Sequence, residues 1–208
     1  VNDATSRRPP FRSPHHTASA VAMIGGGAMA NPGEVSLAHE GVLFLDELPE
    51  FQRRVLEVMR EPLESGCVSL SRARYKTHFP ANLQLLGAMN PCPCGYYGDA
   101  STNCRCSPDQ IRRYRDKISG PLLDRIDLQV SVRPLDRGEL YDTETSEPDD
   151  TIRDHINNAH KIQIQRQGCL NSRLGQKLLS LHCVLSSLQI DLLENAATQL
   201  NLSARAQH

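Results

Sequence analysis

The sequence predicts an α/β fold in which a mostly parallel sheet, flanked by helices, is followed by a mostly helical segment. Two continuous apolar runs, residues 41–45 (GVLFL) and 83–90 (LQLLGAMN), are typical of strands that are buried on both faces. Apolar residues recur every four positions in residues 50–64, which indicates one face of a helix between these strands. From residue 149 onward, helical periodicity replaces the strand pattern.

Local signals predict the remaining elements. Residues 17–24 suit a short helix capped by Thr17, and residues 65–80 alternate weakly around arginines, as in a hairpin. Pro62 is expected to kink or end the helix of residues 50–64. We also expect a third strand at residues 128–132. Three further helices are expected, namely a basic helix capped by Ser107, residues 149–167 and residues 187–200.

Length and composition exclude several classes of protein. The 208 residues suffice for one domain and part of another, and a core built from them must be aliphatic because aromatic residues make up only 4%. The formal net charge of -1 argues against a basic nucleic-acid coat protein. The sequence shows no signal peptide and no apolar run of about 18 residues, so we expect a cytoplasmic protein without a membrane partner.

An adjacent pair of acids follows the first apolar run. Asp46 and Glu47 come directly after residues 41–45, and Asn90 ends the second run. Ligands of open α/β sheets bind beyond the carboxyl ends of the strands. One acid can hold Mg²⁺ through water while the other activates a water molecule, and an asparagine on the next strand can orient that water or a phosphate. The alternative is that the two acids only begin a surface loop.

Several segments resemble the motifs of one family. GVLFLDELPEF (residues 41–51) is similar to the Walker B motif of AAA+ ATPases, and LLGAMNPCPCG (residues 85–95) is similar to their sensor 1 strand. GPLLDRIDL (residues 120–128) resembles the segment that carries the arginine finger, and LSARA (residues 202–206) resembles sensor 2. With RPPFRSPHHTAS and NPGEV, the resemblance narrows to the magnesium-chelatase-like branch and, within it, to the ComM/YifB-type competence ATPases.

The resemblance implies a fold and a function for the chain. It implies a partial AAA+ P-loop NTPase core over residues 1–135, an acidic linker over residues 136–148 and a truncated helical lid over residues 149–208. It further implies a ring-forming, hexameric motor that uses ATP and Mg²⁺, with ComM-type members acting in DNA branch migration during natural transformation. The alternatives are a chelatase-type motor that drives a metal into a porphyrin, and a non-catalytic ring component.

The resemblance also assigns roles to single residues. Asp46 is expected to help to coordinate Mg²⁺, Glu47 to polarise the attacking water, and Asn90 to act as sensor 1. Arg125 would reach the γ-phosphate held by a neighbouring subunit, and the alternative is a local ion pair with Asp124 or Asp127. Arg205 would be the sensor 2 arginine that contacts the nucleotide.

One part of the family pattern is absent from the sequence. No G-x-x-x-x-G-K-[ST] motif occurs among the 208 residues. That loop supplies the backbone N–H groups and the lysine that hold the phosphates of ATP. We therefore expect the chain to be part of a longer protein, to be inactive alone, and to expose some of its apolar strands and self-associate.

Four of the seven cysteines lie close together in the sequence. Cys92, Cys94, Cys104 and Cys106 have the spacing C-x-C-x9-C-x-C, which makes them candidate ligands of a structural Zn²⁺. The alternative is a loop with free thiols. Two histidines, His15 and His16, precede a helix and favour a polar turn over a metal site. The other cysteines are interpreted as small apolar residues; they are Cys67, Cys169 and Cys183.

The predicted hairpin carries alternating basic residues. Arg72, Arg74 and Lys76 would share one face of a strand because side chains alternate between the two faces. In related helicases a hairpin at this position projects into the pore of the ring, so these residues would contact DNA phosphates without reading sequence. The alternative is a solvated hairpin whose cations pair with acids of a neighbouring subunit.

Overall fold

The computed structural model describes residues 8–27, 29–72, 75–98, 103–133, 147–200 and 202–205. The chain divides into two compact units, residues 1–133 and residues 134–208, which are described separately below. Most of the expected acidic linker, residues 136–148, lies outside the described residues.

A parallel three-stranded sheet forms the centre of the first unit. Its strands are β1 (Phe11–Arg12), β4 (Val42–Leu45) and β7 (Gln84–Gly87), in the order β1-β4-β7. Val42 pairs with Phe11 on one side of β4 and with Gln84 on the other. The α/β class and two of the predicted strands are therefore confirmed, although β7 ends three residues before Asn90.

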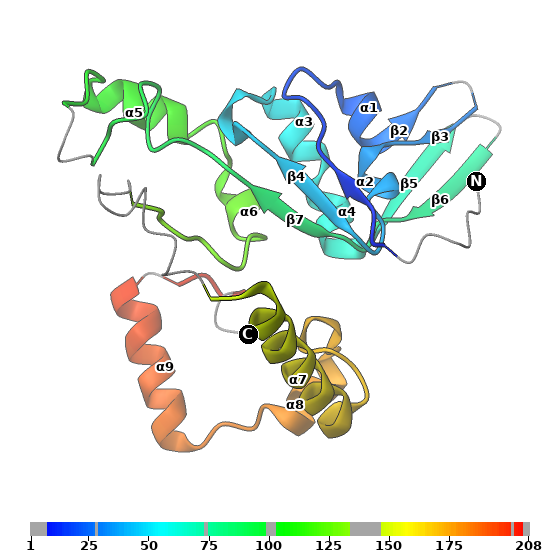
Figure 1. Cartoon of the computed structure of the whole chain (residues 1–208), viewed down its shortest axis with the longest axis vertical. Helices are drawn as coiled ribbons and strands as arrows, with labels where there is room; N and C mark the ends of the chain where they lie inside the picture. Colours follow the sequence, from blue (N-terminus) through cyan, green and yellow to red (C-terminus); the bar gives the residue numbers. More distant parts are fainter. Residues whose placement is uncertain are drawn as a thin grey trace. The chain divides into compact units, whose positions relative to one another are not determined.

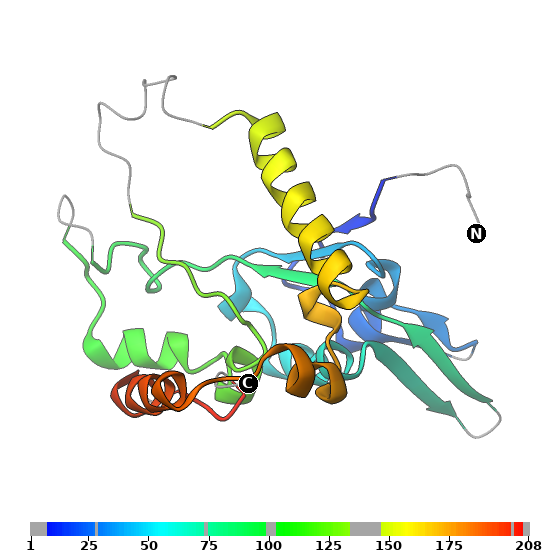
Figure 2. The same cartoon turned by 90° about the horizontal axis from the view of Figure 1, so that it is seen from below.

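Helices cover one side of this sheet (Figures 1 and 2). They are α1 (Ala20–Ile24), α2 (Glu34–Leu37), α3 (Arg53–Val58) and α4 (Arg60–Ser65). Leu43 and Leu45 of β4 are fully buried in the core beneath them, whereas Val42 and Phe44 on the other face are only half-buried. The expectation that this strand is buried on both faces is therefore wrong for the described residues, because their helices pack against one face.

The helix predicted for residues 50–64 is interrupted. A 3₁₀ turn, η1 (Leu48–Glu50), precedes α3, and Met59 separates α3 from α4. Pro62 has no N–H group to donate to the carbonyl of Val58, and its ring crowds that carbonyl. The break consequently falls one helical turn before the proline, instead of at it.

Two antiparallel hairpins complete the strands of this unit. β2 (Gly25–Gly26) pairs with β3 (Asn31–Pro32), and β5 (Cys67–Arg72) pairs with β6 (Tyr75–Pro80), which confirms the hairpin predicted for residues 65–80. The second hairpin projects from the rest of the unit (Figure 2). The first helix begins later than expected, because the side chain of Ser19, and not that of Thr17, accepts the capping hydrogen bond from Ala22 N–H.

The strand predicted for residues 128–132 is not formed. Leu128, Val130 and Val132 are 84%, 80% and 89% exposed, and no described residue pairs with their backbone. An alternating apolar pattern becomes a strand only where another strand accepts and donates its hydrogen bonds. Two helices lie earlier in this region, α5 (Pro108–Arg115) and α6 (Gly120–Leu123), and Ser107 caps α5 as predicted.

The second unit is helical. It contains α7 (Asp149–Gln167), the 3₁₀ turn η3 (Asn171–Arg173), α8 (Gln176–His182) and α9 (Ser187–Leu200), which confirms both helices predicted here. None of its described residues is buried, and several leucines of α9 are exposed. Across the described part of the chain, we find no helix whose length and apolarity would let it cross a bilayer.

Gly41 allows the close contact between β1 and β4, and its replacement tests this packing. A Cβ atom at Gly41 would lie 2.0 Å from the carbonyl oxygen of Pro10, which accepts a hydrogen bond from Val42 N–H. Gly41→Ala is expected to lower the free energy of unfolding by about 3 kcal/mol, measured by urea denaturation. Gly120→Ala is the control, since its Cβ would meet no atom within 4 Å. Equal midpoints for the two variants would contradict this account of the contact.

Candidate functional site

The two predicted acids lie directly beyond the carboxyl end of β4. Oδ1 of Asp46 accepts a hydrogen bond of 2.8 Å from the backbone N–H of Glu47. Glu47 has φ 51° and ψ 45°, which is the left-handed region that residues with a Cβ seldom adopt. Residues in this conformation are enriched at functional sites. Ala30 and Glu40 also have positive φ angles, and Glu47 is the one that directly follows Asp46 at the carboxyl end of β4.

The ends of β4 and β7 are joined by two backbone hydrogen bonds. Ala88 N–H donates to the carbonyl of Leu45, and Leu48 N–H donates to the carbonyl of Ala88, both at 2.9 Å. These bonds hold the residues after the two strands at the same edge of the sheet. The segment that carries Asn90 therefore leaves the sheet at the same edge as the segment that carries Asp46 and Glu47, as the sequence pattern predicts.

His16 is a member of this site that sequence reasoning missed. Its Nδ1 lies 3.0 Å from Oε2 of Glu47, and its ring meets that of Phe51 edge-on. His16 follows β1, which runs parallel to β4, so the residues after both strands meet at one edge of the sheet. The sequence FRSPHH shows two histidines shortly after a strand. It does not show that His16 lies beside Glu47, because that contact depends on the pairing of β1 with β4.

Arg125 lies just after α6 and away from the acid pair. It forms an ion pair with Glu64 of α4, and its NH1 donates a hydrogen bond of 2.6 Å to the carbonyl of Pro121. The side chain is 15% exposed. Among the described residues, the ion-pair partner of Arg125 is thus Glu64 rather than Asp124 or Asp127.

The other predicted site residues lie elsewhere in the chain. Arg205 is exposed in a turn of the second unit. In the hairpin, Arg72 ends β5 and Lys76 is an exposed residue of β6 that pairs with Ser71, whereas Arg74 lies outside the described residues.

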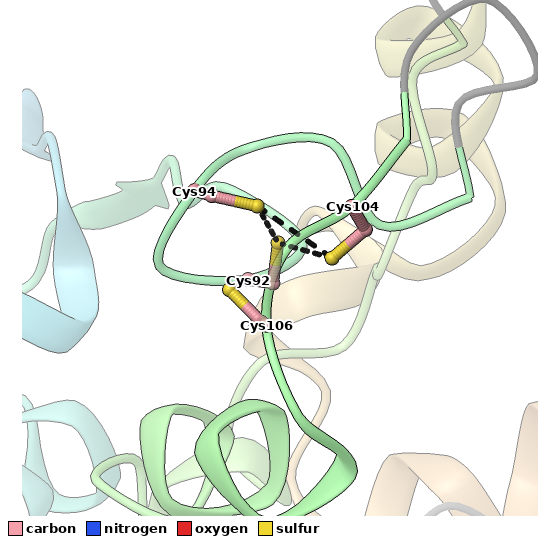
Figure 3. A group of neighbouring side chains, drawn as sticks. All are labelled: Cys92, Cys94, Cys104 and Cys106. Carbon is pink, nitrogen blue, oxygen red and sulfur yellow. Dashed lines mark hydrogen bonds between the residues drawn. The ribbon is translucent and has the colours of Figure 1, made fainter.

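The structure brings the four clustered cysteines together (Figure 3). The Sγ atoms of Cys92, Cys94, Cys104 and Cys106 all lie within 4.8 Å of one another. Cys92 is fully buried, and its Sγ lies 3.4 Å from that of Cys94 and 3.7 Å from that of Cys104. All four are free cysteines. The cluster could therefore hold a metal ion, as expected from the sequence.

Backbone donors favour a thiolate in this cluster. The N–H groups of Tyr96 and Arg105 lower the pKa of Cys94 to about 6. Burial raises the pKa of Cys106 to about 12, and the neighbouring Cys94 adds to that shift. A cation bound by the cluster would displace the remaining thiol protons, because metal ligands of this kind are thiolates.

The fold is an α/β fold that places two adjacent acids at the carboxyl edge of a parallel sheet, which is the edge where open α/β sheets bind ligands. Residues 1–140 match the family model "Magnesium chelatase, subunit ChlI", and residues 146–208 match its C-terminal counterpart. The chain therefore belongs to the magnesium chelatase subunit ChlI family, an AAA+-like family.

Individual relatives agree with this assignment. The chain is 48% identical over 200 residues to "Competence protein ComM" of Haemophilus influenzae, a match covering 96% of this chain and 39% of the relative. It is 47% identical over 201 residues to the uncharacterized protein YifB of Escherichia coli, with the same shares of 96% and 39%. It is 28% identical over 142 residues to "Probable DNA helicase MCM9" of Arabidopsis thaliana, a match covering 68% of this chain and 19% of the relative. The chain thus spans about two fifths of the length of its first two relatives.

Proposed function

We propose that this chain is part of a ring-forming, hexameric ATPase that remodels DNA, in the manner of a branch-migration motor in natural transformation. The observation that carries the proposal is the acid pair at the end of β4, with Glu47 in a left-handed conformation and Asn90 following the adjacent strand. The 48% identity to a competence protein over nearly the whole chain supports DNA as the substrate.

In this proposal each site residue has one task. Asp46 holds Mg²⁺, Glu47 takes the proton of the attacking water, and Asn90 orients that water or the γ-phosphate. Arg125 reaches the nucleotide of the neighbouring subunit, and Arg205 contacts the nucleotide of its own subunit. The cofactors are ATP and Mg²⁺, while the cysteine cluster suits Zn²⁺.

The phosphate-binding loop of such a site is not among the 208 residues. We therefore propose that the chain acts within a longer polypeptide, called the complete protein below, which also contains that loop. This agrees with the 39% of the relative that the match to the competence protein covers.

A chelatase motor is the second candidate function, because both family models that match the chain are named for a magnesium chelatase subunit. ATPase measurements on the complete protein separate the two candidates. We expect single-stranded or branched DNA to raise the ATPase rate of a DNA motor. An unchanged rate with both kinds of DNA would overturn the DNA proposal. A complete protein that binds no ATP would instead favour a non-catalytic ring component.

The projecting hairpin is the proposed DNA contact. Replacing Arg72, Arg74 and Lys76 together by glutamine removes three cations, so the slope of log K against log salt for single-stranded DNA should fall by about 2. Affinity is measured by fluorescence anisotropy over a range of salt concentrations. The matched control replaces three exposed cations of the second unit by glutamine, namely Arg153, Lys161 and Lys177. The hairpin proposal is wrong if both triple variants keep the slope of the unaltered protein.

A further inference from the structure

Building on the proposed nucleotide site, we propose that Zn²⁺ bound by the four clustered cysteines acts as a strut that fixes Asn90 against α5. The ion would then position the sensor asparagine of the ATP site without touching the nucleotide. The ligands are Cys92, Cys94, Cys104 and Cys106.

The cysteines stand at the two ends of one connection. Cys92 follows Asn90 by two residues, and Cys106 directly precedes Ser107, the capping residue of α5. Ser107 and Gln110 form a reciprocal capping box, which fixes the start of that helix. A metal held by all four thiolates would therefore join the end of the β7 segment to the first turn of α5.

The distances between the sulfur atoms fit one tetrahedral ion. Zn–S bonds of about 2.3 Å place the sulfurs of a tetrahedral site about 3.8 Å apart. Cys92, Cys94 and Cys104 have Sγ–Sγ distances of 3.4, 3.5 and 3.7 Å, and all four sulfurs lie within 4.8 Å. Four thiolates in this arrangement select Zn²⁺ over Mg²⁺ or Ca²⁺, which prefer oxygen ligands.

Without a metal ion, few buried side chains would stabilise the connection between β7 and α5. Among its described residues, 91–98 and 103–106, only Cys92 is buried. Its glycines Gly95 and Gly98 have positive φ angles, so its backbone is built from turns. A segment of this kind gains its order from cross-links or metal, because it cannot bury enough apolar surface.

The body of α5 already contacts the segment that carries Asn90. Tyr114 of α5 is buried, at 6% exposed, and the next residue of the helix, Arg115, contacts Pro91, which directly follows Asn90. Nε of Arg115 donates to the carbonyl of Pro91 at 3.3 Å, and Lys117 pairs with Glu50 of η1 at 3.4 Å. The carboxyl end of α5 and the residues just after it therefore contact Pro91 and Glu50, and the metal would anchor the amino end of the helix.

Metal analysis tests the binding step. We expect about one equivalent of zinc per chain, and Co²⁺ in its place should show thiolate charge-transfer absorption and tetrahedral d–d bands. The double variant Cys104→Ser, Cys106→Ser should lose the metal, while the control Cys169→Ser, Cys183→Ser should keep it. Cys106→His should also retain it, because histidine is a zinc ligand. Less than about half an equivalent in the unaltered protein, or iron in place of zinc, would overturn the proposal.

Chelation and re-addition of Zn²⁺ test the strut in the unaltered complete protein. Removal should speed hydrogen exchange at the amides of residues 88–92 and 107–115 and leave β4 and α3 protected, which shows that the domain stays folded. ATP binding should persist while turnover falls about 10-fold and recovers with Zn²⁺. Unchanged exchange in these two segments would overturn the strut. Without any ATPase activity, changed exchange would still support the strut, and the proposed function alone would fail.

Discussion

Replacing Glu47 by glutamine is expected to leave the complete protein able to bind ATP and to slow its hydrolysis by at least about 100-fold. The amide has nearly the same size as the carboxylate, so the left-handed turn and its hydrogen bond to Asp46 persist. It cannot take the proton of the attacking water. ATP binding is measured by equilibrium titration, and hydrolysis is measured in a single turnover, so that product release does not mask the chemical step.

Glu61→Gln provides the matched control for this experiment. Glu61 lies on α4, is exposed, and has no task in the proposed mechanism. It should keep both ATP binding and turnover. Retained turnover in Glu47→Gln would refute the role of Glu47 as the base, and loss of ATP binding would assign it to nucleotide affinity instead.

Replacing Arg125 by alanine is expected to reduce turnover by about 1,000-fold while each subunit still binds ATP. The guanidinium would stabilise the charge that develops on the γ-phosphate held by the next subunit. Its partner in the structure is Glu64 of its own chain, so in the proposed ring the γ-phosphate would replace Glu64 as its anionic partner. Arg153→Ala is the control, since Arg153 is exposed and pairs with Asp150 on the same helix.

Mixing the two inactive variants separates a contact between subunits from a local role. At some interfaces of a mixed ring, Glu47 of an Arg125→Ala subunit meets Arg125 of a Glu47→Gln subunit. Such interfaces contain both groups, so the mixture should regain ATPase activity that neither variant has alone. A mixture as inactive as its components, in rings shown by mass spectrometry to contain both variants, would contradict action across the interface.

Much of the first unit was predictable because its signals are local. The apolar runs at residues 41–45 and 83–90 form strands, and residues 67–80 form a hairpin, because their composition and alternation suit strand structure. Pro62 does break its helix, but the break lies a turn earlier because the proline acts on the carbonyl four residues before it. Residues 128–132 have an equally good pattern and form no strand, since no described residue pairs with them.

Candidate site residues that belong to one sequence motif could be predicted. Contacts between segments that are far apart in the sequence could not. Asp46, Glu47 and the four cysteines are recognisable from spacing and residue type alone. The contact of His16 with Glu47 and that of Glu64 with Arg125 depend on the register of β1 and on the approach of α4 to α6. Neither feature leaves a periodic or compositional trace in a single sequence.

At position 47, the residue that would stabilise the backbone conformation most differs from the residue that the proposed chemistry needs. A residue with a Cβ gives up about 1 kcal/mol in that conformation, and glycine would recover most of it. Glycine would also remove the carboxylate that the proposed chemistry needs. Glu47 therefore occupies a conformation that glycine adopts more easily, and the carboxylate is what the proposed chemistry would lose with glycine.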